Sequence, residues 1–163
     1  MKLRVATAED ATSLAALNHH VHDLHVEAEP AVYRPTQDDE VAARLREVIA
    51  DPDAQIIVAE VDGTQVGYLV WHVIATPTTP YTHARRVAHV DALAVAPTYR
   101  RQGVGRTLME GAASAAAQRG CSDLQLDVRA HNAGAQQFYA RLGYGVAQTR
   151  MTKRLSVRRE LDE

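Results

Sequence analysis

Hydrophobic residues recur along this chain with two different periods, and the longer period marks the helices. Over residues 8–27 they recur every three or four positions, which indicates an amphipathic helix that starts after the capping pair Thr7 and Asp10. A second segment of this kind covers residues 41–49, after a start signal at residues 36–39. Residues 106–119 and 133–142 follow the same pattern, and a glycine comes directly after each, as is typical of a helix end.

Between these segments the pattern changes to that of strands. Residues 55–61 and 65–74 are rich in strand-forming residues on either side of Asp62-Gly63, which predicts a hairpin. Residues 87–95 are nearly all apolar, as expected of an interior strand covered on both faces. Shorter strands are predicted at residues 3–6, 124–128 and 146–155. The order β-α-α-β-β-β-α-β-α-β predicts an α/β fold, a mixed sheet with helices on both faces.

Composition limits the classes of protein to which this chain can belong. The 163 residues suit a single domain, 1–163, and a hydrophobic content of 46% is enough to bury a core. A net charge of −2 and an aromatic content of 5% argue against general nucleic-acid binding. Cys121 is the only cysteine, which excludes an intrachain disulfide. Without a signal-peptide pattern or a membrane-length apolar run, we expect a soluble cytoplasmic protein with no nucleic-acid or membrane partner.

The turn after residue 95 carries the most specific chemistry. It leads through Arg100-Arg101-Gln102-Gly103-Val104-Gly105-Arg106 into a predicted helix. The first N–H groups of a helix lack intrahelical partners and attract anions, glycines permit close approach, and arginines add donors. The Rossmann motif does not fit, because Leu108 stands at its third glycine, and no Gly-Lys-Ser/Thr of a Walker A motif follows. A phosphate-binding turn is predicted, with a tight turn carrying solvated arginines as the alternative.

Two sequence blocks carry a further signal. The first is Arg100-x-x-Gly103-x-Gly105, and the second is Asn132-x-x-Ala135-x-x-Phe138-Tyr139-x-x-Leu142-Gly143-Tyr144. Together they resemble the GCN5-related N-acetyltransferase (GNAT) family. The resemblance implies a GNAT-like fold, with a central, largely antiparallel sheet whose central strands splay apart. It also implies acetyl-CoA as cosubstrate, no metal, and direct transfer of the acetyl group to a primary amine of a small molecule or protein.

The resemblance also assigns residues to acetyl-CoA. The backbone amides of the glycine turn would hold the pyrophosphate, and the backbone of the preceding strand would pair with the pantetheine arm. Asn132 would bind that arm or cap the helix that follows it. The implied cofactor-binding residues are Leu93, Val95, Arg100, Arg101, Gln102, Gly103, Val104, Gly105, Arg106, Asn132 and Tyr139.

The same resemblance implies Tyr139 as the general acid that protonates the departing thiolate. The alternative is a purely structural role, in which Tyr139 only packs beside Phe138. Asp91 and His89 are rival bases for the amine, and strand alternation places both on one face. Because burial of a carboxylate is costly, Asp91 is expected either to abstract a proton through water or to form a buried ion pair.

The acceptor is not identified by any motif. His19, His20, His22 and His25 are spaced like a metal cluster, but no other feature suggests zinc, and we expect them to be solvated or to face the acceptor. Candidate acceptor contacts are His22, His25, Tyr33, Trp71, His72 and Tyr81. The alternatives for function are a non-catalytic acyl-CoA-binding module and a transferase of another acyl group. The resemblance also allows a homodimer.

Overall fold

The structure is a computed structural model that describes residues 1–153 and residue 155. Contacts divide the chain into two compact units, Met1–His131 and Asn132–Glu163, and each is described by itself. The first unit contains, in chain order, β1 (Lys2–Val5), the short 3-10 helix η1 (Ala8–Asp10), α1 (Ala11–Ala28), α2 (Asp38–Ala50), β2 (Ala54–Val61), β3 (Thr64–Thr76), β4 (Arg85–Val95), the 3-10 helix η2 (Pro97–Tyr99), α3 (Val104–Gln118) and β5 (Leu124–Leu126). The second unit contains α4 (Ala133–Arg141).

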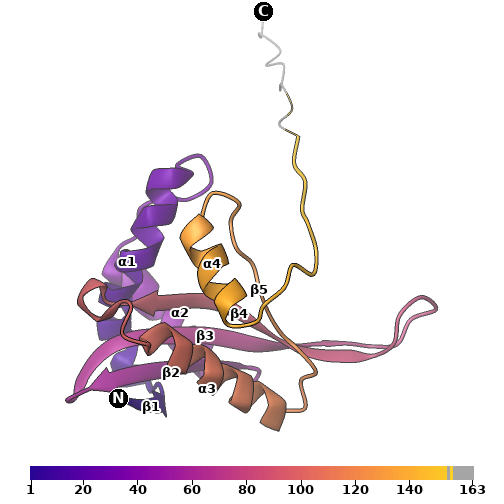
Figure 1. Cartoon of the computed structure of the whole chain (residues 1–163). Helices are drawn as coiled ribbons and strands as arrows, with labels where there is room; N and C mark the ends of the chain where they lie inside the picture. Colours follow the sequence, from indigo (N-terminus) through magenta and orange to yellow (C-terminus); the bar gives the residue numbers. More distant parts are fainter. Residues whose placement is uncertain (154, 156–163) are drawn as a thin grey trace, which may run out of the picture. The chain divides into compact units, whose positions relative to one another are not determined.

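The five strands form one sheet in the order β1-β2-β3-β4-β5, visible as arrows in Figure 1. Each neighbouring pair is antiparallel except β4 and β5, which are parallel. Asp62 and Gly63 both take positive φ, 49° and 78°, so they form the left-handed turn that a two-residue hairpin requires. The predicted hairpin and the mixed, largely antiparallel sheet are therefore confirmed.

Helices cover both faces of this sheet in the first unit. The side chains of Val58, Tyr68 and Val70 point to one face, where they form a buried cluster with apolar residues of α1 and α2. Side chains alternate along a strand, so Gly67 faces the other side. A Cβ there would lie only 3.3 Å from a methyl carbon of Val104 in α3. The absence of a side chain at this position thus lets α3 lie close to the sheet.

A charged group anchors β1 to the start of α1. Asp10 is 7% exposed and accepts hydrogen bonds from both terminal nitrogens of Arg4, at 2.7 and 2.8 Å. It also accepts the backbone N–H of Thr7 at 2.7 Å, as predicted for a capping pair. The Arg4 guanidinium is the main reason that the pKa of the Asp10 carboxyl lies well below its usual range.

β4 contains a bulge at its centre. Trp71 pairs with Val90, but the next residue along the ladder, Val70, pairs with Ala92. Asp91 is therefore an extra residue with no partner on β3. A bulge of this kind bends the strand and redirects the side chain of the extra residue.

β4 and β5 separate soon after they meet. β5 pairs only with Ala88, His89 and Val90 of β4. Beyond the bulge, no strand among the described residues pairs with the β5-facing edge of β4 between Asp91 and Val95. The splayed strands that the GNAT resemblance implies are thus present.

The predicted strand at residues 146–155 is wrong for the described part of that segment. Residues 146–153 and 155 contain no strand, and Val146, Met151 and Leu155 are 90%, 91% and 74% exposed. Alternation of side chains gives a segment the capacity to pair, but a strand also needs a neighbouring edge to receive its hydrogen bonds. In the described part of the second unit, α4 is the one regular secondary-structure element, and a helix offers no strand edge for pairing.

Candidate active site

The glycine turn presents free backbone donors at the start of α3. Gly103 is left-handed, with φ 87°, and no side chain caps the helix that begins at Val104. The first hydrogen bond that closes the helix runs from the Thr107 N–H to the Gly103 carbonyl, at 3.0 Å. The N–H groups of residues 104–106 come before it and point away from the helix body. This is the arrangement that binds phosphate groups, so the turn fits the pyrophosphate of acetyl-CoA.

The arginines of the turn do not share one role. Arg100 donates to two main-chain oxygens, that of Val95 at 3.2 Å and that of His20 at 3.0 Å, and so ties the turn to α1. The closest carboxylate to Arg106 is that of Glu110, 3.9 Å away on the same helix. Arg100 was expected to bind the cofactor, but in this structure its guanidinium is already engaged.

Arg101 and Gln102 complete the turn. Arg101 has a positive φ of 61°, which is strained for a residue with a side chain. Within the described part of the chain its guanidinium makes no hydrogen bond or ion pair, so it is the arginine available to an anion. The side-chain amide of Gln102 donates to the Thr98 carbonyl at 2.7 Å and closes the turn internally.

The unpaired edge of β4 lies where the GNAT resemblance implies that the pantetheine arm binds. Leu93 and Val95 lie beyond the last pair with β5, and on the other side they pair with Leu69 and Gly67 of β3. The Val95 carbonyl accepts a hydrogen bond from Arg100, but no described strand pairs with this segment on the β5 side, which is what an arm that pairs with backbone requires. The side chains of Leu93 and Val95 are half-buried, so a packing role and a backbone role coexist.

In the second unit, Asn132 and Tyr139 lie at the two ends of α4. The Asn132 side chain accepts the N–H of Ala135 at 3.0 Å and caps the helix, which accounts for the structural reading of this residue. Tyr139 is half-buried, with ring centroids 5.0 Å from Phe138 and 5.8 Å from Tyr144. Burial, with a smaller effect from Tyr144, raises the pKa of Tyr139 to about 12, so its hydroxyl stays protonated at neutral pH.

Two imidazoles converge on the bulge residue Asp91. Its Oδ2 lies 2.7 Å from Nδ1 of His72 on β3, and its Oδ1 lies 3.2 Å from Nδ1 of His89 on β4. Nε2 of His89 lies 3.5 Å from a carboxylate oxygen of Asp127, which follows β5. The two predicted base candidates are therefore brought together, and His72, considered only as an acceptor contact, joins them.

The premise that Asp91 is buried is wrong. Its side chain is 43% exposed, although four other residues of β4 are buried: Val87, Ala88, Val90 and Ala94. The bulge explains the difference, because it turns the carboxylate out of the apolar pattern toward the imidazoles.

Three of the predicted acceptor contacts gather at the end of α1. The His25 and Tyr33 rings stack with centroids 5.1 Å apart, and His22 packs edge-on to Tyr33 at 6.2 Å. Arg129, which the sequence analysis did not identify, donates to the Tyr33 hydroxyl at 2.8 Å and lies 3.6 Å from Glu29. Burial lowers the pKa of His25, and nearby cationic groups add to this effect.

The other two predicted contacts behave differently. Trp71 is fully buried, with the guanidinium of Arg119 5.2 Å from its ring centre, so it is a core residue rather than an acceptor contact. Tyr81 is 94% exposed in the loop after β3. His19, at the start of the histidine-rich segment, contacts Asp23 through one ring nitrogen and Asp38 through the other.

Among the residues that the structure describes, one group of His, Cys, Asp or Glu side chains has the spacing of a metal site. It consists of His72, His89 and Asp91, whose donor atoms lie within 4.8 Å of one another. These donor atoms satisfy one another by hydrogen bonds, and we assign no metal to them.

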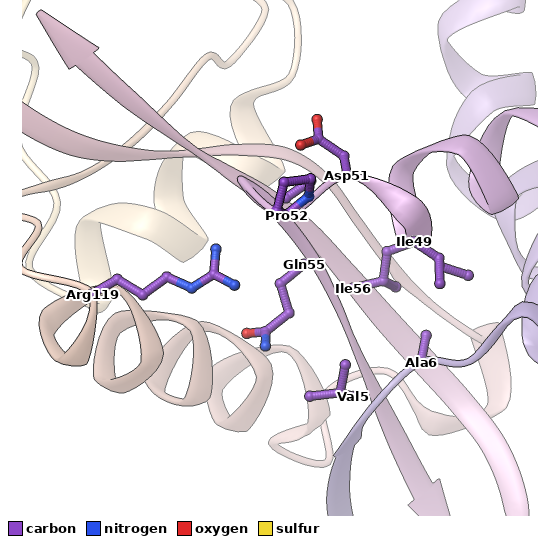
Figure 2. Close-up of a pocket in the computed structure, with 9 residues that line it drawn as sticks. Val5, Ala6, Ile49, Asp51, Pro52, Gln55, Ile56 and Arg119 are labelled. Carbon is purple, nitrogen blue, oxygen red and sulfur yellow. The ribbon is translucent and has the colours of Figure 1, made fainter.

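A pocket of about 240 Å³ lies elsewhere in the first unit, where the chain leaves β1 and α2 and enters β2 (Figure 2). In Figure 2, Arg119 extends from the end of α3 toward Gln55. None of the predicted catalytic or cofactor residues lines it. Its lining residues are Val5, Ala6, Ile49, Asp51, Pro52, Ala54, Gln55, Ile56 and Arg119.

Comparison with known proteins supports the fold. A solved structure, the F44R mutant of the BH1408 protein from Bacillus halodurans, is similar with a TM-score of 0.91 and 26% identity, covering 96% of this chain and 100% of that one. The uncharacterized N-acetyltransferase YhfO of Bacillus subtilis (strain 168) is 28% identical over 88% of this chain and 89% of its own. Aminoalkylphosphonate N-acetyltransferase of Salmonella typhimurium (strain LT2) is 30% identical over 94% and 91%.

The family match includes both sequence blocks. The sequence profile of the Acetyltransferase (GNAT) family matches residues 18–144, a range that runs from α1 through the glycine turn to the end of the second block. No helix among the described residues is long and apolar enough to cross a bilayer. The fold, the uncapped glycine turn and this match together show that the chain belongs to the Acetyltransferase (GNAT) family and is an acyltransferase enzyme.

Proposed function

We propose that this protein transfers the acetyl group of acetyl-CoA directly to a primary amine. The observation that carries the proposal is the uncapped start of α3 at Gly103, together with the open edge of β4 beside it. Bound there, acetyl-CoA supplies an activated acetyl thioester. The family match crosses the boundary between the two units, which supports treating residues 1–163 as one catalytic domain.

The residues of the chain would then divide the work of binding. The N–H groups of residues 104–106 and the free guanidinium of Arg101 hold the pyrophosphate. Backbone groups of Leu93 and Val95 hold the arm, and the side-chain amide of Asn132 is available to it because only its oxygen is used by the cap.

Two further groups would handle protons. Tyr139, kept protonated by its raised pKa, donates to the leaving thiolate. The cluster in which His72 and His89 contact Asp91 accepts a proton from the amine, because an aliphatic ammonium is not a nucleophile until it loses one. The alternatives remain a binding module without turnover and a transferase of a longer acyl group. A cytoplasmic location, no nucleic-acid or membrane partner, and a homodimer are further parts of the proposal.

Calorimetric titration with acetyl-CoA tests the proposal first, with NAD and ATP as controls. We expect binding of acetyl-CoA and CoA and no binding of the controls. A panel of primary amines, from aminoalkylphosphonates to peptides, is then assayed by release of free thiol. Binding without thiol release from any amine would favour the binding module, and turnover only with propionyl-CoA or succinyl-CoA would favour another acyl group. Absence of binding would overturn the proposal.

A further inference from the structure

The cluster around Asp91 contains one ring nitrogen suited to accept a proton. It does not belong to Asp91 or His89, the two residues that the sequence analysis considered as bases. An ionised carboxylate only accepts hydrogen bonds, so a neutral imidazole that faces it must carry its proton on the facing nitrogen. His72 and His89 both face Asp91 with Nδ1. In each neutral ring the lone pair is therefore on Nε2.

The two Nε2 atoms differ in their surroundings. That of His89 lies 3.5 Å from a carboxylate oxygen of Asp127, so it faces a second negatively charged group rather than open space. That of His72 has no hydrogen-bond partner within the described part of the chain. The His72 side chain is 34% exposed, which leaves this atom open to a substrate.

Position in the sheet adds a second argument. His72 pairs with Ala54 of β2 and with His89 of β4, two residues along β3 from Val70. By alternation it shares the sheet face of Val70, which α1 and α2 cover, and α1 also carries the candidate acceptor contacts His22 and His25. The His72 and His89 rings are 5.5 Å apart, so a substrate that reaches one ring is close to the other.

We propose that His72 is the catalytic base and that Asp91 is its positioning residue, with His89 holding the second oxygen of the Asp91 carboxylate. This inference rests on the proposed function and refines it. Nε2 of His72 takes one proton from the ammonium group of the acceptor. The freed amine forms the new N–C bond while the C–S bond breaks. The thiolate takes up the second proton that the amine loses, through Tyr139, and the imidazolium of His72 returns its proton to water.

Within the described part of the chain, the titratable side chains recorded in contact with His72 lie on the neighbouring strand. On β4 they are Asp91 and His89, and through His89 the cluster reaches Asp127. Asp91 is the one that bonds directly to His72, so its substitution is the informative second variant.

Kinetics of the full-length protein test the assignment. We expect His72→Gln to lower kcat by about 10²-fold or more, the usual contribution of a general base, with unchanged affinity for acetyl-CoA. The acidic limb of the pH profile of kcat/KM should disappear in this variant and persist in His89→Gln. His83→Gln, in the exposed loop before β4, is the matched control and should behave as the wild type. Loss of the acidic limb in His89→Gln but not in His72→Gln would overturn the proposal.

A measurement that needs no acceptor separates this proposal from the proposed function. In ¹⁵N spectra of the histidine rings, neutral His72 should be the Nδ1–H tautomer, and Asp91→Asn should shift it toward Nε2–H. An Nε2–H tautomer in the wild type would refute the inference whatever the enzyme acylates. Failure of acetyl-CoA to bind, with the Nδ1–H tautomer present, would instead refute the proposed function.

Discussion

The guanidinium of Arg100 donates a hydrogen bond to the main-chain oxygen of His20, 80 residues away in sequence and 3.0 Å away in space. A second bond from the same guanidinium to Val95 makes it a bridge between the end of β4 and the middle of α1. These contacts give Arg100, a residue of the glycine-turn motif, a structural role. Arg100 fixes the orientation of the glycine turn, and Arg101 is the arginine that is free to meet a phosphate.

Substitution of these two arginines should separate the two roles. Arg100→Met should lower the unfolding free energy by about 1–2 kcal/mol, because two main-chain bonds to a charged donor are lost. Arg101→Met should leave stability unchanged and weaken acetyl-CoA about tenfold, which corresponds to 1.4 kcal/mol. Added salt should reduce the difference in acetyl-CoA affinity between the wild type and Arg101→Met. Urea unfolding and calorimetry measure the two effects, and equal affinity losses in both variants would contradict the distinction.

Gly103 offers a test of the turn with a matched control in the same chain. Gly103 and Gly63 have φ of 87° and 78°, and a Cβ at either position would meet nothing within 4 Å. Alanine should therefore cost about 1 kcal/mol of stability at both positions, through backbone strain alone. Only Gly103→Ala should also weaken acetyl-CoA, since Gly63 lies in the β2–β3 hairpin. Similar affinities of the two variants would show that the turn at Gly103 has no part in binding.

Tyr139→Phe removes the proton donor and keeps the ring. We expect kcat to fall by about 10²-fold, within the range for general acids, with little change in acetyl-CoA affinity. Tyr144→Phe, which alters a neighbouring ring on the same unit, is the control and should lose far less activity. Because the pKa of Tyr139 lies at about 12, its loss should not shift the activity profile below about pH 9. Full turnover in Tyr139→Phe would exclude it from the mechanism.

Asp10 should make the stability of the protein sensitive to acid. Its pKa is lowered in the folded state by Arg4, so the unfolded chain binds the proton more tightly. The contribution of Asp10 is present above the ordinary value of 3.8 and is lost as the pH falls below it. Asp10→Asn should cost about 2 kcal/mol at neutral pH and flatten the acid decline, whereas the exposed Glu47→Gln should do neither. Urea midpoints between about pH 3 and pH 7 provide the measurement, and parallel declines would contradict the assignment.

Local signals in the sequence were sufficient to predict most of the fold. The caps, the helical spacing and the Asp62-Gly63 turn each act within a few residues, and the structure contains the elements they predict. The strand expected at residues 146–155 had to fail as a local prediction, because pairing depends on an edge far away in sequence. The strand β4 also begins earlier than expected, since Arg85 and Arg86 pair with Thr76 and Ala75 beyond the apolar part of the sheet.

The glycine turn was predictable because its chemistry lies in consecutive residues. The role of His72 was not, because it depends on the register between β3 and β4, which the loop at residues 77–84 sets. A one-residue change in that register would separate His72 from His89, and no residue of the loop reveals which register forms. Arg129 and Glu29 were not predicted for the same reason. Arg129 contacts both Glu29 and Tyr33, and it lies 96 positions from Tyr33 in the sequence.

The bulge in β4 also bears on how this chain could change its length. Trp71 and Val70 are neighbours on β3, and their partners Val90 and Ala92 are separated by Asp91 alone. Deletion of Asp91 would therefore close the ladder into a regular one and leave every flanking side chain on its present face. Deletion of a residue farther along β4 would instead draw Asp91 into the ladder and exchange the faces of the residues between the deletion and the bulge. A chain that lost Asp91 would keep its sheet and lose its carboxylate in a single step.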